Sequence, residues 1–213
     1  MLQRYGSCSS YEDSGTSITT FTPPDGGTAR TLRVTFETAF DRVREAFRFE
    51  YEATGLRAAK RGIVWRSTGD LARSWWSQSA QSAEGELSAL LLSVHAGTSG
   101  GTSQMIPGLL LGRPLPWTLG EPIARENELE IPIVGRTMTL FCEKDENGHL
   151  HITRWTAQHR RMRMGTLIDH EDDHEPSEET KSLLAATITQ EVKLRARFDT
   201  EIPASRFARI SGP

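Results

Sequence analysis

A strict alternation of apolar and polar residues is the feature that most constrains the fold of this chain. Near the C-terminus one side of the pattern is apolar, with only Gln190 interrupting it: Ala186, Ile188, Val192, Leu194, Ala196 and Phe198. Polar or charged residues fill the positions between. Because successive side chains of a strand point to opposite faces, this period of two predicts a long strand with one buried face.

The same pattern occurs elsewhere in the chain. Residues 31–37 alternate in this way, which predicts a half-buried strand. Residues 137–142 and 149–155 are also extended in pattern, and Asn147 and Gly148 stand between them. Both of these residues tolerate positive φ, so the pair predicts a β-hairpin.

The remaining segments are less regular. Residues 40–51 favour a short turn or helix followed by a strand, and a cap-like start predicts a helix near 70–82. Residues 86–96 are apolar on both faces, which fits either a central strand or a buried helix, and prolines and glycines predict an irregular loop over 107–122. No regular βαβ alternation occurs. We therefore predict a mainly β (α+β) fold, with an antiparallel, sandwich- or barrel-like sheet and two or three short helices.

Composition suggests where this domain begins. Residues 1–30 hold ten Ser or Thr and four Gly, with almost no periodic apolar positions. This segment is predicted to be a flexible tail that ends in a turn. The rest, residues 31–213, is predicted to be a single β-rich globular domain.

Bulk composition excludes several classes of protein. With 37% hydrophobic and 25% charged residues, the chain is neither a low-hydrophobicity disordered protein nor a membrane-embedded one. Its start lacks the apolar core of a signal peptide, and its two cysteines, Cys8 and Cys142, are too few for a disulfide scaffold. We expect free thiols, with Cys8 in the polar tail, and a cytoplasmic or otherwise intracellular, non-secreted protein.

Residues 97–101 match the G-x-S-x-G turn that exposes the nucleophile of α/β-hydrolases. In this reading Ser99 is the nucleophile, and His170 or His174 follows in the required order. Pro107 interrupts the helix that should follow, and an antiparallel sheet is the wrong scaffold for this motif. A serine hydrolase is therefore the alternative function, and the chain leans towards a protein that is not an enzyme.

Residues 170–174 also match the H-E-x-x-H zinc motif letter for letter. That motif needs a helix with an apolar back, so that both histidines share one face. Here the segment is acidic and Pro176 follows at once, so nothing would bury such a helix. A solvated acidic loop is predicted instead, with no metal and no cofactor.

Charge is distributed unevenly around this loop, although the net charge is only -3. A basic run from 154 to 163 contains no acid, and its cationic or titratable members are Arg154, His159, Arg160, Arg161 and Arg163. The run from 169 to 179 holds seven acids and no Lys or Arg. The basic run is predicted to contact an anionic partner, RNA or an acidic membrane surface, and an RNA-binding protein is a further alternative function.

Self-association explains both runs at once, and it is the leading hypothesis. The acidic run would dock a neighbouring copy through Asp172, Asp173 and Glu175. Trp75 and Trp76, adjacent on the predicted helix, cannot both face one core, so one of them is a candidate interface residue. The sequence thus favours a non-enzymatic, self-associating structural or interaction protein, matrix- or coat-like as in viruses, or adaptor-like.

Overall fold

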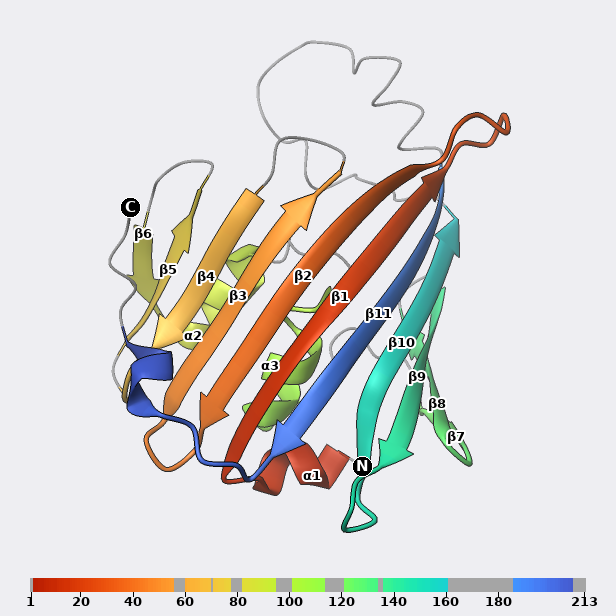
Figure 1. Ribbon diagram of the computed structural model, residues 1–213. Coiled ribbons are helices and arrows are strands. Elements are labelled where there is room, and N and C mark those ends of the chain that lie inside the picture. Colours follow the sequence, from red (N-terminus) through yellow and green to blue (C-terminus); the bar gives the residue numbers. More distant parts are fainter. Residues whose placement is uncertain are drawn as a thin grey trace.

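The computed structural model describes residues 2–55, 60–69, 71–77, 82–94, 101–113, 121–133, 136–160 and 186–208. These residues form one antiparallel sheet of eleven strands with three short helices against it (Figure 1). The strands are β1 Ser10–Thr22, β2 Arg30–Asp41, β3 Ala46–Thr54, β4 Lys60–Arg66, β5 Ala72–Trp76, β6 Ser82–Gly85, β7 Ile123–Arg125, β8 Glu128–Ile133, β9 Arg136–Lys144, β10 Leu150–Arg160 and β11 Thr187–Phe198. The helices are α1 Leu2–Ser7, α2 Leu87–Ser93 and α3 Met105–Leu110, and a 3-10 turn, η3, spans Ala204–Phe207.

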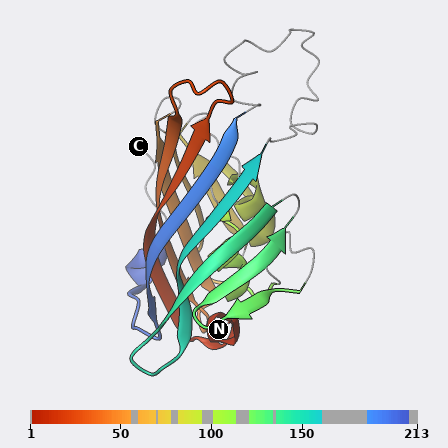
Figure 2. The same ribbon diagram turned by 90° about the vertical axis from the view of Figure 1, so that its right-hand side faces the viewer.

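The strand order places the first strand beside the last strand at the middle of the sheet. The order is β6-β5-β4-β3-β2-β1-β11-β10-β9-β8-β7, so β1 lies between β2 and β11. The outer strands curve towards the side on which the helices lie, as Figures 1 and 2 show. We call the side under the helices the concave face and the other side the open face.

The two faces differ in character because the side chains alternate between them. On the concave face Phe36, Phe49, Leu140 and Trp155 are at most 3% exposed and belong to one large apolar cluster with the helices. The open face is mostly polar. The open face has one small apolar patch near one end of β2 and β3, however, and Ile202 and Phe207 of the C-terminal segment cover it.

The predicted mainly β fold is confirmed, and so are its most regular parts. Residues 31–37 lie in β2, and the C-terminal alternation is β11, with Val192 buried on the concave face. The hairpin is β9–β10, and Gly148 in its turn has φ 79°. The segment 86–96, left open between strand and helix, forms the buried helix α2 over its first part.

Two local predictions are wrong. The helix near 70–82 is absent from the described residues there, which form β5 and the start of β6. Backbone pairing of β5 with β4 outweighs the local helix signals, and it buries Ala72 and Ser74 on the concave face. Within 107–122, the first residues are not irregular, because α3 runs to Leu110.

The flexible tail predicted over 1–30 is also corrected. Residues 10–22 are β1, which pairs along its length with β2 and β11, and residues 2–7 form α1. Cys8 and Cys142 are both buried, and neither forms a disulfide bond. The carboxylate of Asp199 accepts hydrogen bonds from Ser9 N at 2.7 Å and from Arg4 Nη1 at 2.7 Å, which joins the end of β11 to the start of the chain.

Candidate functional site

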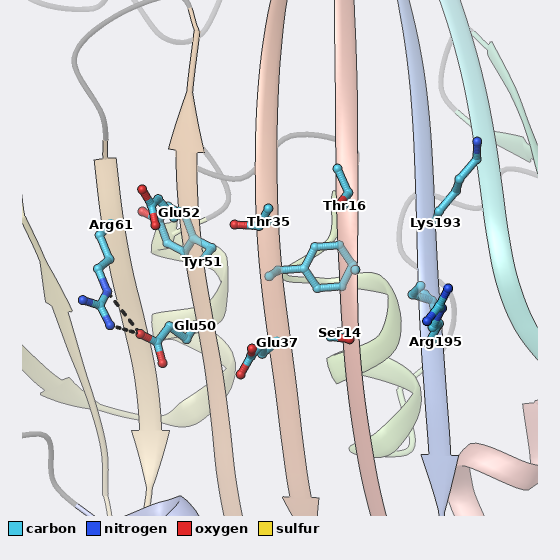
Figure 3. Close-up of a pocket in the computed structure, with 13 residues that line it drawn as sticks. Ser14, Thr16, Thr35, Glu37, Glu50, Tyr51, Glu52, Arg61, Lys193 and Arg195 are labelled. Atoms are coloured by element: carbon cyan, nitrogen blue, oxygen red, sulfur yellow. Dashed lines mark hydrogen bonds and ion pairs between the residues drawn. The ribbon is translucent and has the colours of Figure 1, made fainter.

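A shallow pocket of about 800 Å³ lies on the open face, across β4, β3, β2, β1 and β11 (Figure 3). Its floor carries the hydroxyl groups of Ser14, Thr16 and Thr35. These three side chains reach the open face because β1 and β2 pair with Thr16 opposite Thr35. The pocket is therefore polar and broad, and its base is the sheet itself.

Charged side chains of opposite sign flank this floor. Glu37, Glu50 and Glu52 lie on β2 and β3, whereas Lys193 and Arg195 lie on β11. Lys193 Nζ is 3.3 Å from a carboxylate of its own strand, but Arg195 makes no ion pair with another described residue. The pocket thus has an acidic side and a basic side.

The acidic side is partly neutralised by arginines. Arg48 Nη2 lies 2.8 Å from Glu50 Oε2, and the guanidinium of Arg61 binds the other oxygen. Burial raises the pKa of Glu50, but the hydrogen bonds from Arg61 and Arg48 outweigh it, so the pKa lies below its usual range. Glu50 is therefore a charged structural group, which is unsuited to act as a general base near neutral pH.

A second shallow pocket, of about 660 Å³, continues along the open face. Hydroxyl groups from four strands line it: Thr20, Thr137, Thr139, Thr156 and Thr189. In the first pocket Ser14 lies directly opposite Glu37, and no described histidine lines either pocket. In the described part of the chain, moreover, no three His, Cys, Asp or Glu side chains are grouped to hold a metal ion.

The concave face has a different kind of candidate site, a polar strip along β1. Asp13, Ser17 and Thr19 are at most 5% exposed there, and Thr38 lies directly across from Asp13 on β2. They interrupt a surface that is otherwise apolar. Buried polar groups in such surroundings are costly unless they are hydrogen-bonded, so their partners decide what the strip can do.

The carboxyl group of Asp13 is held by its neighbours on this strip. Tyr11 Oη donates a hydrogen bond of 2.7 Å to Asp13 Oδ2, and Thr38, directly across on β2, also hydrogen-bonds the carboxyl group. Burial raises the pKa of Asp13 to about 7, although Tyr11 and Thr38 lower it. The carboxyl group therefore changes charge near neutral pH.

The sequence did not point to this strip. Asp13 lies in the segment that composition assigns to a tail, and no apolar period marks the segment as a strand. The only local signal is the run of β-branched residues, Thr16, Ile18, Thr19 and Thr20, which favour strands. The predicted site residues lie elsewhere.

Of the predicted basic run, the structure describes the side chain of Arg154. It lies on the open face, with Cζ 3.7 Å from the ring centroid of Phe141 and Nη1 3.5 Å from Glu191 Oε1. His159 and Arg160 belong to β10, but their side chains lie outside the described residues, as do Arg161 and Arg163. The predicted partners, RNA, an acidic membrane surface or a second copy of the chain, stay predictions because a single chain is present.

The two tryptophans of the predicted interface lie on a strand. Trp75 and Trp76 are adjacent on β5, so they point to opposite faces, and both are half-buried. Trp76 packs against the apolar cluster of the concave face. One of them was a candidate interface residue because two adjacent residues of a helix cannot both face one core. They lie on a strand instead, so that reason no longer applies.

The other predicted site residues lie outside the described part of the chain. They are Ser99, His170 and His174 of the hydrolase alternative, and Asp172, Asp173 and Glu175 of the acidic run. The described helices include none that is long and apolar enough to cross a membrane.

The sequence matches no protein-family model and no curated protein. Among the solved structures that it resembles is a DUF1329 family protein from Desulfovibrio piger, 10% identical, with 97% of this chain and 92% of that chain covered and a TM-score of 0.38. Another, from Vibrio parahaemolyticus, is described as an outer membrane lipoprotein-sorting protein domain; it is 8% identical, with 92% and 88% covered and a TM-score of 0.30. At these TM-scores, neither structure says what this chain binds.

The comparisons run against the predicted function and location. Neither structure is described as a viral matrix or coat protein or as RNA-binding, so the matrix-like, self-associating function and the RNA-binding alternative are not carried forward. The predicted intracellular, non-secreted location is not carried forward either, because one of the two is described as an outer membrane lipoprotein-sorting protein domain. The fold adds a physical reason: the supposed flexible tail is the central strand β1.

Proposed function

We propose that this protein binds an elongated apolar ligand, such as the hydrocarbon chain of a lipid, between its concave face and helices α2 and α3. We call these two helices the cover. The observation that supports the proposal is the make-up of the concave face. One continuous apolar cluster extends across it from β5 to β8, and the helices over it are only six or seven residues long.

Helices this short depend on packing. An isolated helix of fewer than about 12 residues is marginal in water. The cover is held by its buried apolar side chains, which are Leu87, Leu90, Leu91, Met105, Ile106, Leu109 and Leu110. It contributes no strand to the sheet, so displacing it leaves the hydrogen bonds between strands intact. A ligand chain that takes its place restores the apolar contacts.

The cover is anchored at one end. Arg42 Nη2 donates hydrogen bonds to the carbonyl oxygens of Leu110, at 3.1 Å, and of Tyr5, at 3.0 Å, which fixes the end of α3 to α1. An exposed ion pair of 3.3 Å between Arg113 and Glu86 joins the end of α3 to the start of α2. These contacts fix the end of α3, whereas α2 is held by its packing on β4, β5 and β6.

Binding of linear primary alcohols tests this function. Octanol, decanol and dodecanol, titrated calorimetrically below their solubility limits, are expected to bind at one site. Each added methylene is expected to strengthen binding by about 0.8 kcal/mol, roughly fourfold in affinity, with a negative heat-capacity change. An affinity that does not change with chain length would contradict the proposal.

Two neighbouring leucines of α2 give a matched control. Leu91 is 3% exposed and packs in the apolar cluster, whereas Leu92 is 59% exposed. Leu91→Ala is expected to bind dodecanol more tightly, because displacing the cover breaks fewer contacts, and Leu92→Ala is expected to bind it as the unchanged chain does. Equal affinities for both variants would argue against a displaceable cover.

A further inference from the structure

The larger pocket of the open face owes its shape to differences in side-chain length. Its floor carries the short side chains of Ser14, Thr16 and Thr35, whereas longer charged side chains stand on the strands at either side (Figure 3). Short side chains between long ones leave a hollow of about 800 Å³, which is a usual size for a small-molecule site. The charged sides of this pocket therefore determine which ligand fits.

Strand register sets opposite charges at the two ends of a row across this floor. Thr16 pairs with Thr35 on β2 and with Lys193 on β11. Thr35 pairs in turn with Glu52 on β3, so the row reads carboxylate, hydroxyl, hydroxyl, ammonium, as Figure 3 shows. Its end strands are three strand spacings apart, about 14 Å. Because strand side chains stand roughly perpendicular to a sheet, the two charges lie on opposite sides of the floor.

The neighbouring row has the same polarity. Ser14 pairs with Arg195 on β11 and with Glu37 on β2. Glu37 pairs in turn with Glu50 on β3. The cation is again on β11 and the carboxylates are on β2 and β3, so the two rows together make the acidic side and the basic side of the pocket.

Arginines of the protein already bind two of the three carboxylates. Glu50 is held between Arg48 and Arg61, and Glu37 accepts a hydrogen bond from Arg206. The charges of these two carboxylates are therefore largely neutralised within the protein.

Each side of the pocket keeps one charged group outside these pairs. Glu52 and Arg195 are both exposed, and neither forms an ion pair with another described residue. Water solvates each of these charges separately. A ligand that carries both a cation and an anion gains from the two sides at once, because each of its ends forms charge-assisted hydrogen bonds with the opposite charge.

We infer that this pocket binds a small zwitterion of dipeptide size, with its ammonium group at Glu52 and its carboxylate at Lys193 and Arg195. An extended chain of two residues spans about 7 Å, and an ion-pair contact of about 3 Å at each end brings the total close to the width of the floor. The hydroxyls of Thr16 and Thr35 offer donors and acceptors to the peptide group between the two ends. The site lies on the other face of the sheet from the proposed apolar ligand and does not depend on that function.

Three dipeptides of equal length test the inference by NMR titration of the full chain at pH 6.5. They are glycylglycine, N-acetyl-glycylglycine, which lacks the cation, and glycylglycinamide, which lacks the anion. Glycylglycine is expected to bind at least threefold more tightly than either of the others, as exposed charge pairs allow, and to shift backbone N–H signals of β1, β2, β3 and β11 around the pocket. N-acetyl-glycylglycine that binds as tightly would mean an anion site only and overturns the inference, as does the absence of saturable shifts with glycylglycine.

Two arginines of β11 give a matched comparison. Arg195→Gln removes the guanidinium of the basic side and is expected to reduce the preference for glycylglycine over glycylglycinamide. Arg197→Gln removes the same group two residues along the same face, where it lies 2.7 Å from Glu12, and is expected to keep that preference. On the acidic side, Glu52→Gln is expected to reduce the preference over N-acetyl-glycylglycine. Preferences that are unchanged in both Arg195→Gln and Glu52→Gln would place the ligand elsewhere and overturn the inference.

Discussion

Replacing Asp13 by asparagine is expected to stabilise the protein by about 4 kcal/mol at pH 8 and to change its stability little at pH 4. The reason is the burial of the carboxyl group, which raises its pKa from 3.8 to about 7. Each unit of such a shift corresponds to about 1.4 kcal/mol between the folded and unfolded states. Asparagine keeps an acceptor for the Tyr11 hydroxyl and carries no charge at any pH.

The direction of the pH dependence follows from the raised pKa. Between pH 3.8 and about 7 the folded protein keeps the proton on Asp13 and the unfolded chain has lost it. Rising pH therefore removes stability across this window, and the loss is complete above about pH 7. Urea unfolding of both proteins at several pH values from 4 to 8 measures the effect. A difference between them that is the same at every pH would contradict a buried, titrating Asp13.

Truncating Trp155 to alanine is expected to lower the free energy of unfolding by about 3–5 kcal/mol. Trp155 is fully buried on β10, opposite Leu140 of β9 and Val192 of β11, in the apolar cluster of the concave face. Its removal leaves a cavity that a sheet paired on both sides cannot close by collapse. The midpoint of urea unfolding reports the loss, with an unchanged slope if the transition stays two-state.

Trp75→Ala is the matched control for this change. Trp75 is half-buried on the open face of the short strand β5, so its loss is expected to cost less than half as much as that of Trp155. An equal cost for the two variants would mean that the open face carries a core comparable with that of the concave face.

The sequence was most informative where polar and apolar residues alternate. In β11, Val192 and Leu194 face the cluster while Lys193 faces the pocket, so the same pattern that predicted the strand also assigned the sides. The β9–β10 hairpin was predicted from Asn147 and Gly148 for a local reason: the turn needs positive φ, which Gly148 has. Fold class followed from such local patterns.

β1 shows what local patterns miss. Asp13, Ser17 and Thr19 are polar although they are buried, so the alternation that marks a strand is absent from it. It forms because β2 and β11, far apart in sequence, both pair with it along its length. The candidate site is on this strand, and for that reason composition assigned its residues to a tail.

Helix signals failed at β5 for a similar reason. The cap-like start and the helix formers near residue 70 are local preferences worth a few tenths of a kcal/mol each. Pairing with β4 places Ser74 opposite Val64 and buries both, which outweighs those preferences. One sequence shows its hydrophobic periodicity and its turn residues. It does not show which distant segments pair as neighbouring strands.

Contact between the ligand and Trp155 is the most direct test of the central claim, that an apolar chain binds under the cover. A dodecanol brominated along its chain quenches tryptophan fluorescence on contact. The quenching is expected to fall clearly in Trp155→Phe and to persist in Trp75→Phe, because Trp155 is in the apolar cluster of the concave face and Trp75 is on the open face. Quenching that is unchanged in Trp155→Phe and lost in Trp75→Phe would place the ligand on the open face and contradict the proposed function.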